Sequence, residues 1–287
     1  MSWTPERTRH ALHFFRRQGE HGAVPVYDSI GADFPLALAP GWLNLGLWQN
    51  PWGDPADAEE ACYRLVAKMA EVLPEDGDIL DVANGLAAQD PVIDRVALPR
   101  SLTAVNITAS QLIAGRERLA EAGARAVRAD AVHLPFVEAS MDGVICVEAA
   151  FHFSSRREFF ADALRVLRPG GVLSMSDVPA QRMPRSPREV IAGLGQLRVW
   201  GLHRGSVASS FEIARMVEDA GFDGLRVTLC GDQVIDPAVR FVRRVLPTAP
   251  GLSAAQRYAV RMFLGHVELL RRNGLLEYML LHARKPG

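Results

Sequence analysis

Buried strands alternate with amphipathic helices through the middle of the sequence, and this alternation most restricts how the chain can fold. Short apolar runs at 78–82 (DILDV) and 101–106 (SLTAVN) predict strands, whereas residues 56–73 and 109–123 place apolar side chains at helical spacing. Strands separated by helices of this length are joined by crossover connections, which require parallel pairing. The sequence therefore predicts an α/β fold with a mostly parallel sheet and helices on both faces.

The alternation continues to the end of the sequence, with two interruptions. Residues 178–208 contain a predicted helix around 188–200, and residues 231–273 contain the helical pattern AAQRYAVRMFLGHVELLRR. We interpret the two interruptions as a helical substrate cap inserted into the sheet domain. Further helices are predicted at 155–167 and 209–220, and further strands, which bring the total to seven, at 124–130, 141–148, 172–177, 224–230 and 275–285.

These predictions divide the chain into four parts. The expected parts are an N-terminal helical and aromatic lid (1–55), a cofactor-binding core (56–177), the substrate cap (178–208 and 231–273) and the closing part of the core sheet (209–230 and 274–287).

Composition restricts the partners and the compartment. The net charge of −1 gives no electrostatic reason to expect a nucleic acid or an anionic membrane as partner. No apolar run approaches the roughly 20 residues of a membrane helix. The three cysteines are scattered, which suits a reducing compartment and offers no zinc-binding spacing. We expect a soluble cytoplasmic protein with a small-molecule substrate, and a homodimer remains open.

The segment ILDVANGLAAQD at 79–90 joins the first strand to a loop that has one glycine, Gly85. Glycines in such a loop permit a tight turn and close approach of a ligand to the backbone. Ala83 and Ala87 are the smallest replacements, and Asn84 tolerates unusual backbone angles. The dinucleotide pattern G-x-G-x-x-G is absent and no acidic residue ends the second strand, so NAD is disfavoured.

Short polar side chains end four of the predicted strands. Asp81 ends the first, Asn106 the second, Asp130 followed by Ala131 the third, and Glu148 the fourth. The carboxyl ends of parallel strands meet at one edge of a sheet, where ligands bind in α/β proteins. This constellation suits a ribose, an adenine amino group and a charged amino-acid tail.

The order of ILDVANGLAAQD, TAVNITASQL, VRADAVHLPF, VEAAFHF and RVLRPGGVLSMSDV resembles the class I S-adenosylmethionine-dependent methyltransferases. It is most similar to the small-molecule branch that includes erythromycin-type and rebeccamycin-type O-methyltransferases, with sterol and tocopherol C-methyltransferases as wider relatives. The resemblance covers roughly residues 20–180. It implies a Rossmann-like fold, S-adenosylmethionine as cofactor and methyl transfer to a small-molecule secondary metabolite such as a polyketide, a sugar or an aromatic compound.

The resemblance also implies roles for individual residues. The loop at 83–87 would contact the methionyl part of the cofactor, Asn106 stands where the family places an acidic residue on the ribose, and Asp130 matches the residue that holds the adenine amino group. The aromatic segment upstream resembles a lid, with Trp42, Asn44 and Trp48 as further candidates. The predicted cofactor-binding residues are Asp81, Ala83, Asn84, Gly85, Asn106, Gln111, Asp130, Ala131, Glu148 and Tyr27.

Methyl transfer from a sulfonium needs alignment and exclusion of water, and a hydroxyl acceptor gains from a general base. His152 follows the fourth strand and titrates near neutrality in water, so we predict it as the base. Asp177 ends the fifth strand and is predicted to orient the imidazole. The resemblance supports both roles. A metal is not required.

Two other functions remain open at the level of sequence. A C-methyltransferase acting on a prenyl or other carbon acceptor would use an aromatic pocket to stabilise a cation. A methyltransferase fold without methyl transfer, such as a cyclase or a binding module, is suggested by the loop with a single glycine.

Overall fold

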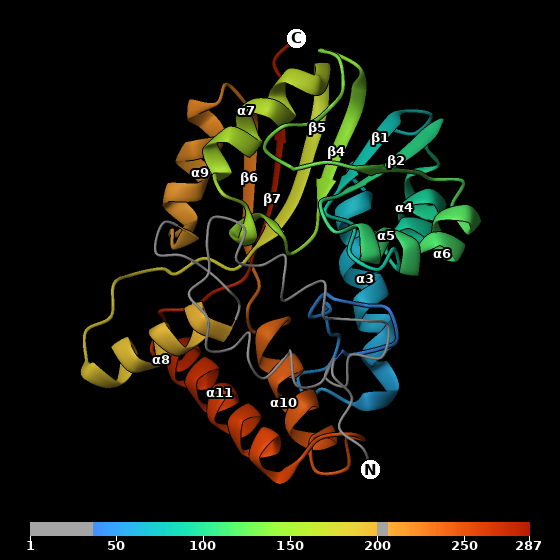
Figure 1. Cartoon of the computed structure of the whole chain (residues 1–287). Helices are drawn as coiled ribbons and strands as arrows, with labels where there is room; N and C mark the ends of the chain where they lie inside the picture. The colour runs from blue at the N-terminus through green and yellow to red at the C-terminus, as the bar shows by residue number, and fades with distance from the viewer. Residues whose placement is uncertain (1–36, 200–205) are drawn as a thin grey trace.

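The computed structural model describes residues 37–199 and 206–287, and at its centre lies a seven-stranded sheet (Figure 1). The strand order is β3-β2-β1-β4-β5-β7-β6. The strands are β1 (Asp78–Val82), β2 (Ser101–Asn106), β3 (Arg125–Arg128), β4 (Met141–Cys146), β5 (Leu167–Asp177), β6 (Asp223–Leu229) and β7 (Met279–Arg284).

Strands β1 to β5 pair in parallel, whereas β7 lies antiparallel between β5 and β6. The predicted mostly parallel, Rossmann-like seven-stranded sheet is therefore confirmed. The order changes direction between β1 and β4, because β2 and β3 follow on one side of β1 and β5 follows on the other side of β4. Such a switch point is where α/β sheets bind ligands.

Helices cover both faces of the sheet (Figure 1). Ile79 and Leu80, consecutive residues of β1, belong to two different hydrophobic clusters because successive strand side chains point to opposite faces. The helices are α3 (Ala58–Ala70), α4 (Asp90–Ala97), α5 (Ala109–Ala114), α6 (Arg116–Glu121), α7 (Arg156–Val166), α8 (Pro187–Val199), α9 (Ser210–Asp219), α10 (Ile235–Val245) and α11 (Ala254–Arg272), with 3-10 turns η1 (Pro55–Asp57) and η2 (Ala150–His152).

The helix predicted at 109–123 is wrong in one respect, because it is broken at Gly115 into α5 and α6. A Cβ at Gly115 would lie 2.7 Å from the Cβ of Ala87 and 2.9 Å from the Leu86 carbonyl oxygen. The break thus lies where the chain passes against the loop after β1. Helix α4 was not predicted, although Pro91 in its first turn is a signal for a helix start.

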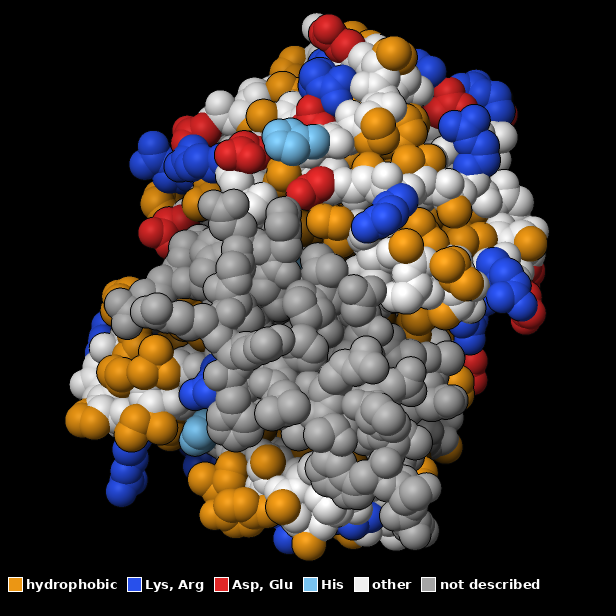
Figure 2. Space-filling model, in the orientation of Figure 1, with side chains coloured by type: hydrophobic (Ala, Val, Ile, Leu, Met, Phe, Trp, Pro, Cys, Tyr) orange, Lys and Arg blue, Asp and Glu red, His pale blue; other side chains and the backbone are white. Residues whose placement is uncertain are grey.

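Helices α8, α10 and α11 lie together at one end of the sheet (Figure 1). Helix α8 exposes the apolar side chains of Val190, Ile191 and Leu194. Figure 2 shows hydrophobic side chains gathered over the region of this helix. The substrate-cap role of these helices stays a prediction, as do the domain boundaries. Among the residues described, no helix is long and apolar enough to cross a membrane.

Candidate active site

A pocket of about 1000 Å³ opens at the carboxyl ends of β1, β2 and β4, at the switch in strand order. Most of the site residues predicted from the sequence contribute to its wall. They are Ala83, Asn84, Gly85, Asn106, Gln111, Asp130, Ala131, Glu148 and His152. Asp81 and Asp177 are not among the lining residues, and Tyr27 lies outside the described residues.

The loop after β1 keeps a glycine-like backbone at two alanines. Ala83, Gly85 and Ala87 have φ values of 62°, 60° and 62°, all in the left-handed region that favours glycine. The backbone N–H of Ala83 donates to the Val105 carbonyl at 2.7 Å, which holds the start of the loop against β2. Both alanines therefore adopt a backbone conformation that favours glycine.

The segment before η1 forms one wall of the pocket. Trp42, Leu43 and Asn44 line the pocket, and a Cβ at Gly85 would lie 3.1 Å from Leu43 Cδ1. The side chain of Trp48 instead lies in the hydrophobic core, with its ring centroid 5.9 Å from that of Phe241. Of the aromatic lid candidates, Trp42 is thus placed at the pocket and Trp48 is not.

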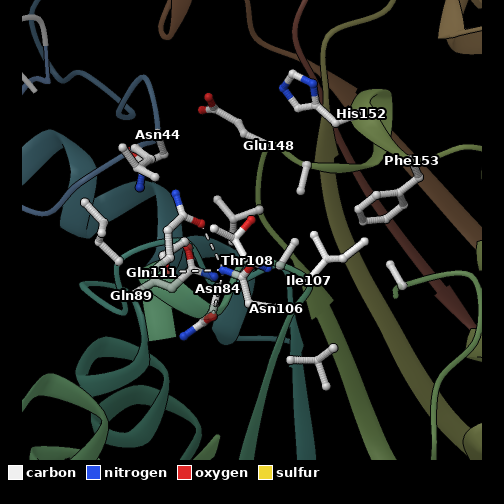
Figure 3. Close-up of a pocket in the computed structure, with 18 of the residues that line it drawn as sticks. Asn44, Asn84, Gln89, Asn106, Ile107, Thr108, Gln111, Glu148, His152 and Phe153 are labelled. Carbon is white, nitrogen blue, oxygen red and sulfur yellow. Dashed lines mark hydrogen bonds between the residues drawn. The ribbon is translucent and has the colours of Figure 1, made fainter. Parts of the chain in front are cut away.

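Asn106 connects the loop to the following helix. Its Nδ2 donates to Gln111 Oε1 at 3.0 Å and to the Gly85 carbonyl at 3.3 Å, and its Oδ1 accepts from the Thr108 backbone N–H at 2.9 Å (Figure 3). An ionised aspartate has no donor for the two acceptors. The asparagine therefore gives the loop a cross-link that an acidic residue at this position would not provide.

Asp81 is fully buried and does not line the pocket. Both of its carboxylate oxygens accept from Gln89 Nε2, at 2.7 and 2.8 Å, and Gln89 itself lines the pocket. Asp90 accepts from Asn84 Nδ2 at 3.1 Å. Burial raises the pKa of Asp81 well above its usual range, with the charge of Asp90 adding to the effect, and burial raises the pKa of Asp90 to about 7. Sequence reasoning did not find Gln89 or Asp90.

Glu148 occupies the opposite side of the pocket, close to the segment that contains Asn44 (Figure 3). Its φ is 50°, and its Oε1 accepts from the Leu45 backbone N–H at 2.8 Å and from the Tyr278 hydroxyl at 2.7 Å. Burial raises the pKa of Glu148 to about 7, although both hydrogen bonds favour the ionised form. Tyr278 was not a sequence candidate.

His152 ends η2 and lines the pocket near Glu148 and Phe153 (Figure 3). Burial lowers the pKa of His152 to about 3, and the charge of Arg156 acts in the same direction. The imidazole is therefore uncharged at neutral pH. This differs from the sequence expectation of a histidine that titrates near neutrality.

Asp177 has a different partner from the one predicted. Arg156 donates to both of its oxygens, from Nε at 2.8 Å and from Nη2 at 3.0 Å, and both side chains are almost fully buried. The third nitrogen of this guanidinium, Nη1, donates to the Ser206 carbonyl at 2.6 Å. A buried carboxylate is satisfied by this pairing, which explains why Asp177 does not face the pocket.

The part of the chain that the structure describes contains no group of three or more His, Cys, Asp or Glu side chains that could hold a metal ion.

Comparison with known proteins identifies the family of the chain. The methyltransferase-domain family matches residues 80–175, which include the loop at 83–87, the polar residues that follow the strands, and His152. The 27-O-demethylrifamycin SV methyltransferase of Amycolatopsis mediterranei is 30% identical over 85% of this chain and 90% of its own length. The chain belongs to the class I S-adenosylmethionine-dependent methyltransferases. The erythromycin 3''-O-methyltransferase of Saccharopolyspora erythraea is 27% identical over 91% of this chain and 89% of its own length.

Solved structures share the fold of this methyltransferase. A putative sarcosine dimethylglycine methyltransferase from Galdieria sulphuraria has a TM-score of 0.72 at 20% identity, covering 85% of this chain and 93% of its own. The [4+2]-cyclase SpnF has a TM-score of 0.69 at 20% identity, covering 99% and 96%. At this identity the likeness shows the fold alone.

S-adenosylmethionine is the cofactor of the enzyme. The pocket fits it chemically, because carboxylates of Asp130 and Glu148 in its wall suit a ligand that carries an adenine amino group, a sulfonium and an ammonium. The individual binding roles predicted from the sequence, including those of Asp130, Ala131 and Gln111, stay predictions.

Proposed function

We propose that this enzyme transfers the methyl group of S-adenosylmethionine to a hydroxyl group of a small-molecule secondary metabolite, with His152 as general base. Two relatives support the reaction class, since their names describe O-methylation of erythromycin and of a rifamycin. The observation that carries the proposal is an uncharged histidine in the wall of the cofactor pocket. The predicted homodimer and cytoplasmic location stay predictions.

When bound, the cofactor supplies a methyl group that is already activated for displacement. The residues of the chain have to exclude water, align the acceptor oxygen and take its proton. Trp42 and Phe153 supply apolar parts of the pocket wall, and the neutral imidazole of His152 accepts the hydroxyl proton. Asp177 is not free to hold this imidazole, so we propose that it acts on His152 only through Arg156.

Replacement of His152 by alanine tests the base. A base of low pKa is a weak proton acceptor, so we expect a rate loss of about 10²-fold, at the lower end of general-base effects. The assay measures methylated product from hydroxylated macrolide, sugar and aromatic acceptors, and cofactor binding is measured in parallel. His133→Ala is the matched control and should keep the wild-type rate. It removes an exposed histidine that follows Asp130 by three residues.

The outcome also separates the alternatives. An unchanged rate in His152→Ala, with a new C-methyl signal in the NMR spectrum of the product, would replace the proposal by C-methylation. Cofactor binding without a methylated product from any acceptor would favour a function without methyl transfer.

A further inference from the structure

Glu148 joins three segments that are far apart in the sequence. Its Oε1 accepts hydrogen bonds from the backbone N–H of Leu45, in the segment that forms the pocket wall, and from the hydroxyl of Tyr278, which precedes β7. Its own backbone N–H donates to Ser176 Oγ on β5 at 3.0 Å. Both side-chain hydrogen bonds fall on Oε1, and Oε2 has no hydrogen-bond partner among the residues that the structure describes. Oε2 is thus the oxygen available to a ligand in the pocket.

Tyr278 is built into the protein interior. Its side chain is fully buried, and its ring belongs to the hydrophobic cluster that includes Trp48 and Phe241. A buried phenol is normally hydrogen-bonded, and here the hydroxyl donates to Glu148 at 2.7 Å. A donor held in this way fixes the direction of the carboxylate and stabilises its charged form.

The groups that face Glu148 from the neighbouring elements are uncharged near neutral pH. Burial is the main cause that raises the pKa of the Cys62 thiol on α3, the pKa of Cys230 after β6 to about 12, and the pKa of Tyr278. Burial also lowers the pKa of His152 on η2 to about 3. Glu148 is therefore the group of this set that changes its charge around pH 7.

We propose that Tyr278 is a positioning residue for the cofactor: its hydroxyl holds the Glu148 carboxylate as an anion facing the positively charged end of S-adenosylmethionine. This inference rests on the proposed function, because it takes the pocket that Glu148 lines as the site of S-adenosylmethionine. It does not depend on the identity of the acceptor. Loss of the hydroxyl removes a hydrogen bond that favours the ionised carboxylate, so the pKa of Glu148 rises. A cationic ligand then binds more weakly at neutral pH, and its affinity recovers as the pH rises.

The test is Tyr278→Phe, with S-adenosylmethionine binding measured by calorimetry from pH 6 to pH 9 in the absence of any acceptor. We expect binding about tenfold weaker than wild type at pH 7, since a hydrogen bond to a charged group is lost. The ratio of the two affinities should approach one at pH 9. Because the ratio compares two proteins with the same ligand, the ionisation of the cofactor itself cancels.

Adenosine separates a positioning role from a structural one. It shares the nucleoside part of the cofactor and has neither the sulfonium nor the amino-acid tail, so Tyr278→Phe should bind it with wild-type affinity at every pH. Equal losses for adenosine and S-adenosylmethionine would mean that the pocket has been distorted, which overturns the proposal. Tyr258→Phe removes an exposed phenol hydroxyl on α11 and is the matched control, with no expected change.

Glu148→Gln keeps an oxygen for both donors and removes the charge, and it serves as a second variant should Tyr278→Phe fail to fold. It should weaken S-adenosylmethionine binding at pH 9, where Glu148 of the wild type is ionised. It should also remove the change in affinity that the wild type shows near pH 7. A Glu148→Gln protein with wild-type pH dependence would assign that titration to the Asp81–Asp90 pair and overturn the proposal. Failure of hydroxyl methylation would appear only in product assays, so the two proposals fail separately.

Discussion

Replacing Ala83 by glycine should stabilise the enzyme, although most substitutions destabilise a protein. Ala83 has a φ of 62°, where an L-residue costs about 1–2 kcal/mol because its Cβ approaches the following carbonyl oxygen. Glycine avoids this cost but loses about 0.5–1 kcal/mol more backbone entropy on folding. Its half-buried methyl group packs against the core, and losing it costs about 0.4 kcal/mol. The expected net gain is about 0.4 kcal/mol in the free energy of unfolding, or a rise of about 1 °C in melting temperature.

The same substitution at two other alanines provides the comparison. Ala87 has the same φ but is fully buried against Gly115, so the loss of its methyl group costs about 0.8 kcal/mol and leaves a net change near zero. Ala120 lies exposed in α6 with helical backbone, and glycine there should destabilise by about 0.5–1 kcal/mol.

Urea-induced unfolding of the three variants and wild type measures these differences. We expect Ala83→Gly to be more stable than Ala87→Gly, and Ala87→Gly to be more stable than Ala120→Gly. If Ala83→Gly unfolds at the same lower urea concentration as Ala120→Gly, the backbone at residue 83 is not strained. The alanine would then be a favourable residue for this loop.

Two further predictions concern charged groups that do not line the pocket. Arg156→Met should lower the free energy of unfolding by about 3–5 kcal/mol, because it leaves the buried Asp177 carboxylate without its partner; a loss below about 1 kcal/mol would show that solvent replaces the guanidinium. At Asp78, hydrogen bonding to Arg100 is the main cause that lowers the pKa to about 2. The stability that Asp78 contributes is therefore present above its ordinary pKa near 3.8 and is lost as the pH falls toward 2, so the difference in urea midpoint between wild type and Asp78→Asn should shrink over this interval, whereas a constant difference would contradict the ion pair.

Local patterns in the sequence were sufficient to predict the sheet and the cofactor edge. A strand buried on both faces reads as an apolar run, and a polar residue at its end must lie at the carboxyl edge once pairing is parallel. Asn106, Asp130 and Glu148 follow this rule and line the pocket. The loop at 83–87 was predictable in part, since the small residues Ala83, Gly85 and Ala87 occupy its positions of positive φ, whereas Asn84, for which unusual backbone angles were considered, has none.

The tertiary structure alone decided what each polar group binds. Tyr278 lies 130 residues from Glu148 in the sequence, and Arg156 lies 21 residues from Asp177, so no local period connects either pair. In the structure, Asp81 accepts a hydrogen bond from Gln89, and Asp177 accepts one from Arg156. Burial leaves His152 uncharged at neutral pH. Hydrogen-bond partners and desolvation depend on which segments pack together, and both set the charge of a buried group. The sequence therefore determines where the site lies, and only the packing determines the ionisation of its residues.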